Sequence, residues 1–197
     1  MGRYCETKHG LAMCLLAGSL WVVPAVADED YEPMARALVT EILYGDLHRP
    51  FVIEAIRAQN ERDIDTDDAA IVEFEQQWYR ESLDGYGPLI SQVDQNSVST
   101  YLRTLKAQSD ALYTELLVMD KRGFLVAQSD IATDYFQGDE RKFLLTFPRG
   151  AGEIFVDLVA YDASVQAIQS QVSFTIVDPD TGEPIGAATV GVNGDKL

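Results

Sequence analysis

The stretch LYTELLVMDKRGFLVAQSD, residues 112–130, decides the fold, because the pattern of the chain changes there from helical to β-type. Two runs rich in apolar and β-branched residues lie on either side of the segment Asp-Lys-Arg-Gly at 120–123. A glycine at the end of such a segment supplies the positive φ that a tight turn between antiparallel strands requires. The stretch therefore predicts a β-hairpin with Gly123 in its turn.

More β-type sequence follows this hairpin. The further runs are EIFVDLVAY at 153–161, VQAIQSQVSFTIVD at 165–178 and PIGAATVGV at 184–192. Short segments with turn chemistry, DAS and DPDTGE, separate them. The preceding stretch DERKFLLTF, residues 139–147, is expected to form a short helix. Residues 112–197 thus predict a five-stranded antiparallel sheet with a helical insert after its second strand.

The part of the chain before the hairpin, residues 28–111, carries apolar residues at helical spacing. Asp65 or Thr66 is placed to cap one of these helices, and Ser97 is placed to cap the last. Helices ahead of an antiparallel sheet indicate the α+β class, with the helices packed on one face of the sheet. Residues 28–197 make a chain of 170 residues, which is the length of a single domain.

The first 27 residues are expected to be a cleaved export signal. Arg3 and Lys8 precede a largely apolar stretch, and Ala25-Val26-Ala27 provides small residues at the positions that signal peptidase requires. An uncleaved membrane anchor is the alternative. The apolar stretch is, however, shorter than the ~20 residues that span a bilayer, so cleavage and a soluble periplasmic protein are predicted.

The composition of residues 28–197 limits the classes of function. Both cysteines, Cys5 and Cys14, belong to the predicted signal, so the mature chain has no thiol for a disulfide or a thiolate metal site. Removing the signal takes away two of the 15 basic and one of the 32 acidic residues, which leaves a net charge of −18. Such a charge disfavours nucleic acid and anionic lipid as partners.

The order of these elements and their local sequence motifs resemble those of a known family. The stretches that carry the resemblance are ELLVMDKRGFLVAQSDIATDYFQGDE at 115–140, VDLVAYDAS at 156–164, QSQVSFTIVDPDTGEPIG at 169–186 and AATVGVN at 187–193. They are similar to the extracellular Cache domains of bacteria, PAS-like sensor domains of the PhoQ-DcuS-CitA type. The helical half at 28–111 matches that family only in kind.

The resemblance implies a small-molecule pocket between the sheet and the loops and short helix beyond its second and third strands. Cache domains of receptors lie between membrane spans that lead to an output module. Here the chain ends at Leu197 without such a module, so a sensor of this kind is expected to signal through a partner such as a membrane receptor or kinase. A protein-interaction module on the same fold, with a filled core and no ligand, is the alternative function.

The segment TDYFQGDERKF, residues 133–143, lies where this fold places its pocket. Tyr135, Phe136 and Gln137 are candidate ligand-binding residues, because binding sites favour aromatic side chains with a polar group. Gly138 allows a close approach of the backbone. Lys142 offers a positive charge to a carboxylate ligand, although a solvated lysine has the same appearance in sequence.

Alternation in the fourth predicted strand gives a second set of candidates. Ile168, Val172, Phe174 and Ile176 fall on one face, which is expected to be core, and a polar row falls on the other. The ligand-binding candidates here are Gln169, Gln171 and Ser173, with Tyr161 at the turn before the strand; for Asp162, beside Tyr161, a plain turn role is favoured over ligand binding. A solvent-facing strand would look the same, and the resemblance favours the pocket.

Metal binding and catalysis find little support. Asp63, Asp65 and Asp67 occupy the first, third and fifth positions of an EF-hand-like loop, but Asp68 replaces its glycine and Phe74 its final glutamate. The only histidine of the mature chain is His48, in a helix junction, and no hydrolase, zinc-protease or phosphate-loop motif is present. We therefore expect neither an enzyme, nor a cofactor, nor a metal site.

Overall fold

The computed structural model of the protein describes residues 31–62 and 67–196, apart from the side chain of Ile42. The predicted export signal lies outside the described residues, as do Asp63, Asp65 and Thr66. None of the described helices combines the length and the apolar character that a bilayer span requires.

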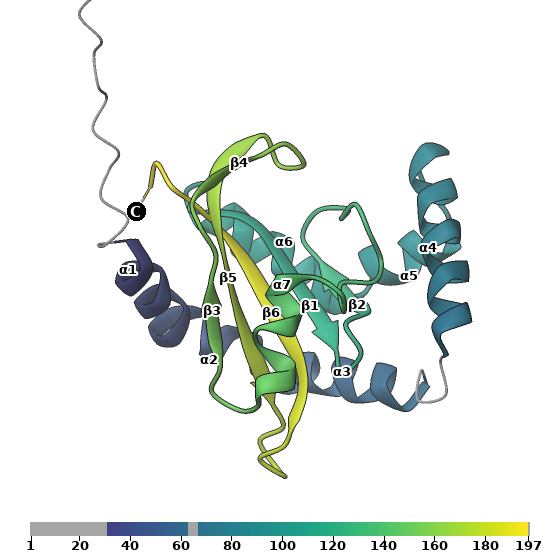
Figure 1. The fold of residues 1–197 in the computed structure, drawn as a ribbon, viewed down its shortest axis with the longest axis horizontal. Helices are drawn as coiled ribbons and strands as arrows, with labels where there is room; N and C mark the ends of the chain where they lie inside the picture. Colours follow the sequence, from purple (N-terminus) through teal and green to yellow (C-terminus); the bar gives the residue numbers. More distant parts are fainter. Residues whose placement is uncertain (1–30, 63–66, 197) are drawn as a thin grey trace, which may run out of the picture.

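The helical and strand elements follow one another in the predicted order (Figure 1). The helical half contains α1 (Tyr31–Leu38), the π-helix η1 (Val39–Leu43), α2 (Tyr44–Leu47), α3 (Pro50–Arg62), α4 (Asp68–Leu83), α5 (Pro88–Asp94) and α6 (Ser97–Gln108). The second half contains β1 (Tyr113–Asp120), β2 (Leu125–Gln128), α7 (Arg141–Leu144), the 3-10 helix η2 (Phe147–Arg149), β3 (Ile154–Val156), β4 (Ala160–Asp162), β5 (Ala167–Val177) and β6 (Pro184–Asn193).

The caps of two helices differ from the predicted residues, by one or two positions in the first helix and by one in the second. Asp67 is the N-cap of α4, where its Oδ1 accepts a hydrogen bond of 2.9 Å from the amide of Ala70. Asn96, not Ser97, caps α6 by accepting 2.9 Å from the amide of Ser99. Both corrections have the same cause, because a carboxylate or amide oxygen stands one or two positions away from the predicted residue and satisfies the free N–H groups.

The strands of the described chain form one antiparallel, six-stranded sheet with the order β2-β1-β6-β5-β3, and β4 also pairs with β5. The α+β class and the hairpin at Gly123, whose φ is +94°, are confirmed. The predicted run 153–161 forms two short strands rather than one. Asp157 interrupts it, because its side chain accepts from the amide of Leu158 at 2.9 Å and its carbonyl from the hydroxyl of Ser170 at 2.6 Å.

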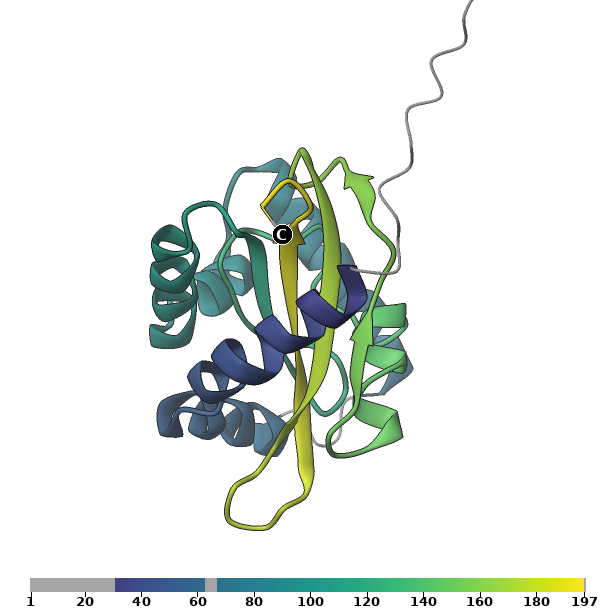
Figure 2. The same cartoon turned by 90° about the vertical axis from the view of Figure 1, so that its left-hand side faces the viewer.

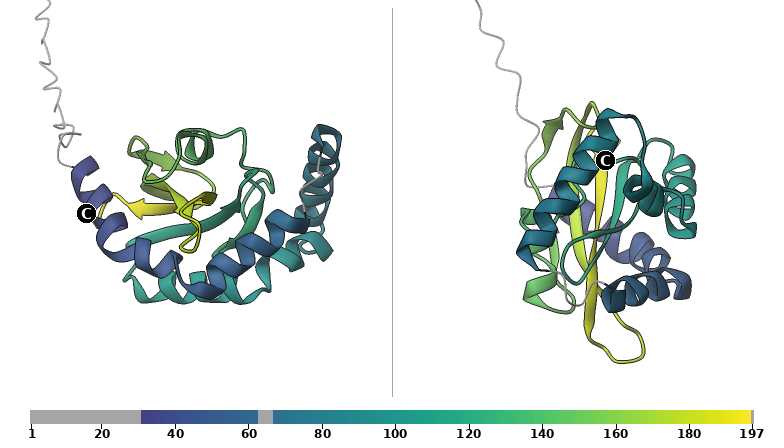
Figure 3. Two further views of the ribbon diagram at one scale, coloured as in Figure 1. Left: turned by 90° about the horizontal axis from the view of Figure 1, so that it is seen from below. Right: turned by 90° about the vertical axis from the view of Figure 1, so that its right-hand side faces the viewer.

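Helices cover one face of this sheet. Seen from below, α1, α2, α3 and α6 lie in a layer on that side, while α7 lies on the opposite side (Figure 3). Figure 2 shows α1 crossing the C-terminal strands obliquely. Val172, Phe174 and Ile176 of β5 are buried beneath these helices, as the alternation predicted, whereas Ile168 near the end of the strand is 46% exposed. This layer is the main apolar core.

The opposite face changes character along its length. At one end Leu117, Met119 and Phe124 pack with Trp78 of α4 and with Phe143 of α7. At the other end the same face carries polar side chains from β1 and β5. Residues 129–140, which join β2 to α7, pass over this face and are called the cover segment below (Figure 1).

Candidate functional site

A cavity of about 580 Å³ lies at the polar end of this face. Its floor is formed by Glu115 and Leu117 of β1 and by Gln171 of β5. The cover segment, the start of α7 and the turn that follows β4 form its walls. A volume of this size falls within the range of small-molecule sites, which is ~300–1,000 Å³.

The floor is a network of amides around one carboxylate. The side-chain amides of Gln169 and Gln171 both donate to Oε1 of Glu115, at 3.1 and 2.8 Å. Gln169 also donates to Asp162 at 2.8 Å and accepts from the hydroxyl of Thr114. Glu115 is 8% exposed and Gln169 3% exposed, so these groups satisfy one another largely away from water.

Gly191 of β6 makes this network possible. In the register of the sheet it lies between Glu115 on β1 and Gln171 on β5. A Cβ at this position would overlap the side chains of Thr114, Glu115 and Gln169. The missing side chain therefore leaves the space in which the amides and the carboxylate meet.

Gln137 lines the cavity and is almost completely buried. Its side chain is 1% exposed, and its Nε2 donates to the carbonyl of Asp134 at 2.7 Å. Its Oε1 is buried and has no hydrogen-bond partner in the described part of the protein. Gln137 is held in place by its own backbone, whose amide donates to the carbonyl of Gly123 at 2.8 Å. Leaving a buried acceptor unpaired costs about 1–3 kcal/mol, which a hydrogen-bond donor that reaches this oxygen would offset.

The close contact of two glycines fixes this part of the wall. A Cβ on Gly123 would overlap the backbone of Gly138, and a Cβ on Gly138 would overlap the carbonyl of Arg122. The close backbone approach expected at Gly138 is thus present. It joins the turn of the β1–β2 hairpin to the cover segment and so places Gln137 beside the cavity.

Lys142 lines the cavity but its charge is already compensated. The side chain is 9% exposed, and its Nζ lies 3.2 Å from Oε2 of Glu140. Glu140 stands at the N-cap of α7, yet its carboxylate makes no capping bond and turns to the lysine instead. Lys142 therefore does not offer the free ammonium group that would favour a carboxylate ligand.

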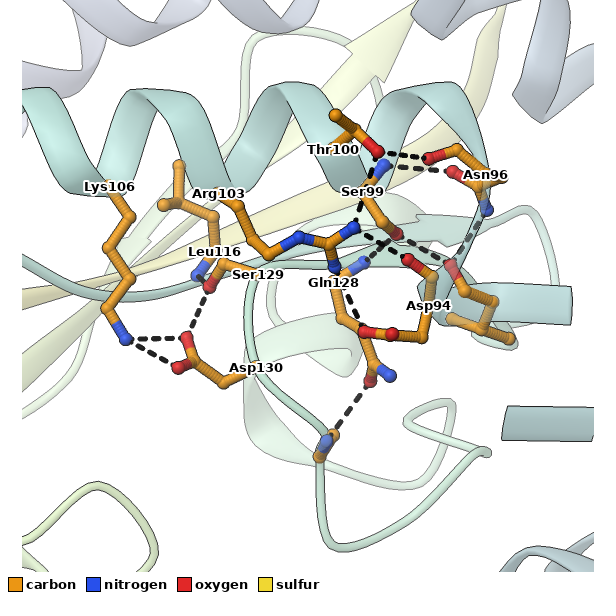
Figure 4. A network of polar contacts seen from close by, with 12 residues as sticks. Asp94, Asn96, Ser99, Thr100, Arg103, Lys106, Leu116, Gln128, Ser129 and Asp130 are labelled. Atoms are coloured by element: carbon orange, nitrogen blue, oxygen red, sulfur yellow. Dashed lines mark hydrogen bonds and ion pairs between the residues drawn. The ribbon is translucent and has the colours of Figure 1, made fainter. Parts of the chain in front are cut away.

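A second ammonium group is also paired. Lys106 extends from α6, and its Nζ lies 2.7 and 2.6 Å from the two carboxylate oxygens of Asp130 (Figure 4). Ser129 donates to the same carboxylate at 2.6 Å and accepts from the amide of Leu116 at 2.9 Å. The start of the cover segment is thereby tied both to α6 and to β1.

The interior of the cover segment is held by hydrogen bonds to β2 and to α4. Buried Gln128 accepts a bond of 3.0 Å from the amide of Ala132, while its Nε2 has no partner among the described residues (Figure 4). From α4, the indole of Trp78 donates to the carbonyl of Ala132 at 3.0 Å. Glu75 accepts from the amide of Phe136 at 2.6 Å. The cover segment is therefore directly connected to α4.

Two carboxyl groups near the site have shifted pKa values in opposite directions. Burial, reinforced by the negative charge of Asp134, raises the pKa of Glu75 in spite of its bond from the Phe136 amide. For Asp162 burial also acts to raise the pKa, but hydrogen bonds from Ser164 and Gln169 outweigh it, so the pKa is lowered. Asp162 therefore stays ionised at the cavity rim.

The structure brings together three of the predicted ligand-binding residues, Gln137, Lys142 and Gln171, around one cavity. Gln169 belongs to the network beneath it. Ser173 is fully buried deeper in the sheet, where its hydroxyl lies 2.9 Å from that of Thr189.

The aromatic candidates lie elsewhere. Tyr135 is 2% exposed, and its ring stacks on Trp78 with centroids 5.5 Å apart, so its ring belongs to the apolar cluster under the cover segment. Phe136 packs against Phe124 and lines a separate cleft beside α4. Tyr161 is 67% exposed and borders a shallow groove behind the β4–β5 turn. Tyr135 lacks the polar exposure assumed for it because the hairpin and α4 enclose it.

Apart from Asp162, sequence reasoning did not identify the acidic side chains of the site. Glu115 had a recognisable signal, as a charged residue on an otherwise buried strand, but only the sheet register places it beside the glutamines. Asp134 and Glu140 lie in the predicted segment but were not proposed as ligand contacts.

The described residues contain no candidate metal cluster, and their single histidine packs against an aromatic side chain. Within 31–62 and 67–196, no cluster of three or more histidine, cysteine or acidic side chains is arranged to hold a metal ion. His48 is stacked on Tyr44, with ring centroids 3.8 Å apart, and accepts a bond of 3.3 Å from the amide of Val177. Burial lowers the pKa of His48, in keeping with a neutral packing role.

No protein-family model matches the chain, and no curated protein matches it. Among solved structures it resembles an extracellular ligand binding receptor from Desulfohalobium retbaense, at 14% identity and a TM-score of 0.38, over 75% of this chain and 26% of that one. It also resembles the sensory domain of the Campylobacter jejuni chemoreceptor Tlp3 with isoleucine bound, at 14% identity and a TM-score of 0.41, over 84% and 65%.

A third resemblance is to the E. coli DcuS sensor domain, at 17% identity and a TM-score of 0.39, over 64% of this chain and 87% of that one. The chain spans less than two thirds of the length of the first two proteins. These three are described as a receptor and two sensor domains, and their likeness to this chain is distant.

Proposed function

We propose that the protein is an exported sensor of Cache type that binds a small polar molecule in the cavity beneath the cover segment. The observation that carries this proposal is a cavity of about 580 Å³ lined by Gln137, a buried side chain whose Oε1 has no hydrogen-bond partner among the described residues. Native proteins rarely leave such an acceptor unsatisfied, and a bound molecule is one way to supply the missing donor.

The polar floor supports ligand binding over the alternative of a ligandless interaction module. A module without a ligand gains stability by filling this space with apolar side chains, as the other end of the same face does with Phe124, Tyr135 and Trp78. Here the space is bordered instead by Glu115 and Gln171, held by hydrogen bonds in fixed positions. Fixed polar groups around a cavity provide orientation and specificity for a ligand.

Signalling through a partner has a structural route in this proposal. A ligand touching Gln137 acts on the cover segment, and Trp78 and Glu75 connect that segment to α4. Val72, Tyr79 and Leu83 of α4 are all more than half exposed. We propose that a membrane receptor or kinase senses the position of α4, since this helix is linked to the cavity and accessible from outside.

Export to the periplasm is part of the same proposal, and it is supported by the Ala25-Val26-Ala27 pattern of the sequence. N-terminal sequencing of protein from fractionated cells tests it. The expected product begins at Asp28 and is found in the soluble periplasmic fraction. Protein that keeps Met1 and remains in washed membranes would contradict cleavage and favour the anchored form.

Ligand binding is tested by a thermal-shift screen of polar metabolites. A ligand at about a hundred times its Kd stabilises the fold by roughly 2.7 kcal/mol. For a domain of this size this corresponds to an increase in Tm of roughly 5 to 10 °C.

A pair of variants on β5 shows whether the shift arises in the cavity. Gln171→Ala removes a floor group, whereas Thr175→Val changes a buried residue further along β5, outside the cavity lining. The ligand-induced shift should be lost in Gln171→Ala and retained in Thr175→Val. A screen in which no compound gives a shift sensitive to Gln171→Ala would contradict the proposal and favour the interaction module.

A further inference from the structure

The chemistry of the cavity also restricts the class of ligand. We infer that its ligand is a small organic cation carrying a protonated amine, an inference that rests on the proposed function.

The charge balance is negative. The cavity is lined by five carboxylates and two ammonium groups, the former being Glu115, Asp130, Asp134, Glu140 and Asp162, and the latter Lys106 and Lys142. The two lysines are paired with Asp130 and Glu140. Glu115, Asp134 and Asp162 remain without an ion pair to any described lysine or arginine, so the field inside the cavity attracts cations and repels carboxylates.

The unpaired group points to the same class. Gln137 already uses its Nε2 as a donor to Asp134, so the part of the amide that is free is an acceptor. On the floor, Gln169 uses its amide hydrogens for Glu115 and Asp162, and Gln171 uses one of its two for Glu115, so carboxylate oxygens are more numerous than free N–H groups as partners for a ligand. A protonated amine is a donor with three hydrogens and no acceptor, which fits this arrangement.

The spacing of the acids favours an organic cation over a metal ion. A metal requires several ligand atoms at about 2.0–2.6 Å from one point. The described residues contain no group of three or more acids, histidines or cysteines with that geometry. The negative charges are instead distributed around a cavity of about 580 Å³, which suits a cation whose hydrogen-bond donors are carried on a carbon skeleton.

A matched series of four-carbon probes tests the inference by calorimetry and thermal shift: 1,4-diaminobutane, 1,4-butanediol and succinate, with shorter and longer members of each series. These probes share their skeleton and differ in charge. We expect saturable binding of members of the diamine series, weaker or no binding of the diols and none of the dicarboxylates. The affinity of the diamine should fall as the salt concentration rises, because screening weakens charge attraction.

Variants separate the cavity from the acidic surface of the whole protein. Glu115→Gln removes one negative charge from the floor with little change of shape, and Glu183→Gln does the same at an exposed turn. Glu115→Gln should raise the Kd of the diamine by about tenfold or more, as expected when a buried charge loses its partner. Glu183→Gln should leave the Kd of the diamine unchanged. Equal affinity in both variants would show nonspecific surface binding and would overturn the inference.

The failure of the inference can be distinguished from that of the proposed function. Binding of a dicarboxylate or a neutral compound that is lost in Gln171→Ala would refute the amine ligand while leaving a ligand-binding sensor in place. Absence of a Gln171-sensitive response to compounds of every charge would refute both.

Discussion

The two faces of the sheet are built in different ways. The helix-covered face is continuous and aliphatic, with Val172, Phe174 and Ile176 fully buried under α1, α2, α3 and α6. The opposite face is apolar only where α4, α7 and the hairpin reach it, and it ends in a polar network around Glu115. One strand, β5, serves both faces through its alternation.

This difference separates stability from binding within one sheet. The free energy of unfolding derives mainly from apolar area, which is concentrated on the helix-covered face. The polar end contributes little apolar burial, and its hydrogen bonds hold side chains around an open volume. Neighbouring residues of β5 should therefore affect different properties, stability on the helix-covered face and the polar network on the other.

Phe174→Ala and Ser173→Ala compare the two faces at adjacent positions of β5. Phe174 is 1% exposed in the main core, and its loss should lower the free energy of unfolding by about 3–5 kcal/mol. Ser173→Ala removes one hydrogen bond to Thr189 and should cost only about 1 kcal/mol. Urea unfolding measures both values. Equal losses would contradict the division between the faces.

Trp78→Phe tests how the cover segment is held. The substitution keeps an aromatic ring in the cluster but removes the indole donor, leaving the carbonyl of Ala132 without that bond. We expect a loss of about 1–3 kcal/mol in unfolding free energy and faster amide exchange in residues 129–140. Tyr79→Phe, on the exposed side of the same helix, is the control and should have no effect on either. Unchanged exchange in Trp78→Phe would show that α4 does not restrain the segment.

Glu75→Gln tests the second connection between α4 and the cover segment through pH. The raised pKa of Glu75 means that the folded protein binds a proton more tightly than the unfolded chain does. This residue's contribution to stability is therefore most favourable at low pH and declines as the pH rises through the interval between its ordinary value of 4.5 and the raised value.

Glutamine keeps the acceptor for the Phe136 amide but does not titrate, so the variant lacks this decline. As the pH is raised from the acidic side of this interval to neutrality, the Tm of the wild type should fall relative to the Tm of Glu75→Gln. Two melting curves that change with pH in parallel would contradict the assignment.

Local pattern was sufficient to predict most of the fold. The spacing of apolar residues and the turn residues predicted the helical half, the hairpin and the core face of β5, because each of these features depends on residues that are close in sequence. The division of 153–161 into two strands was missed, since Asp157 breaks the run through contacts with Ser170 that only the pairing of the strands creates.

The site was predictable only in part for the same reason. Local sequence and a family resemblance selected Gln137, Lys142 and Gln171, which lie around one cavity; their role in binding stays a prediction. Glu115 becomes part of the site through the register of β1 with β6 and of β6 with β5, and the pairing of Lys142 with Glu140 depends on the local backbone. The charge of the cavity, which determines the expected ligand, is thus a property of the tertiary structure.

The most direct test follows the side-chain amide resonances of the glutamines by NMR during titration with 1,4-diaminobutane, or with the amine of its series that gives the largest increase in Tm. Gln137 and Gln171 should shift with a common saturation curve, because the ligand donates to one and lies against the other. The side-chain amide resonance of Gln59, which is buried and donates to Asp120, should not change. Unchanged resonances of Gln137 and Gln171 throughout the titration would contradict a ligand site beneath the cover segment.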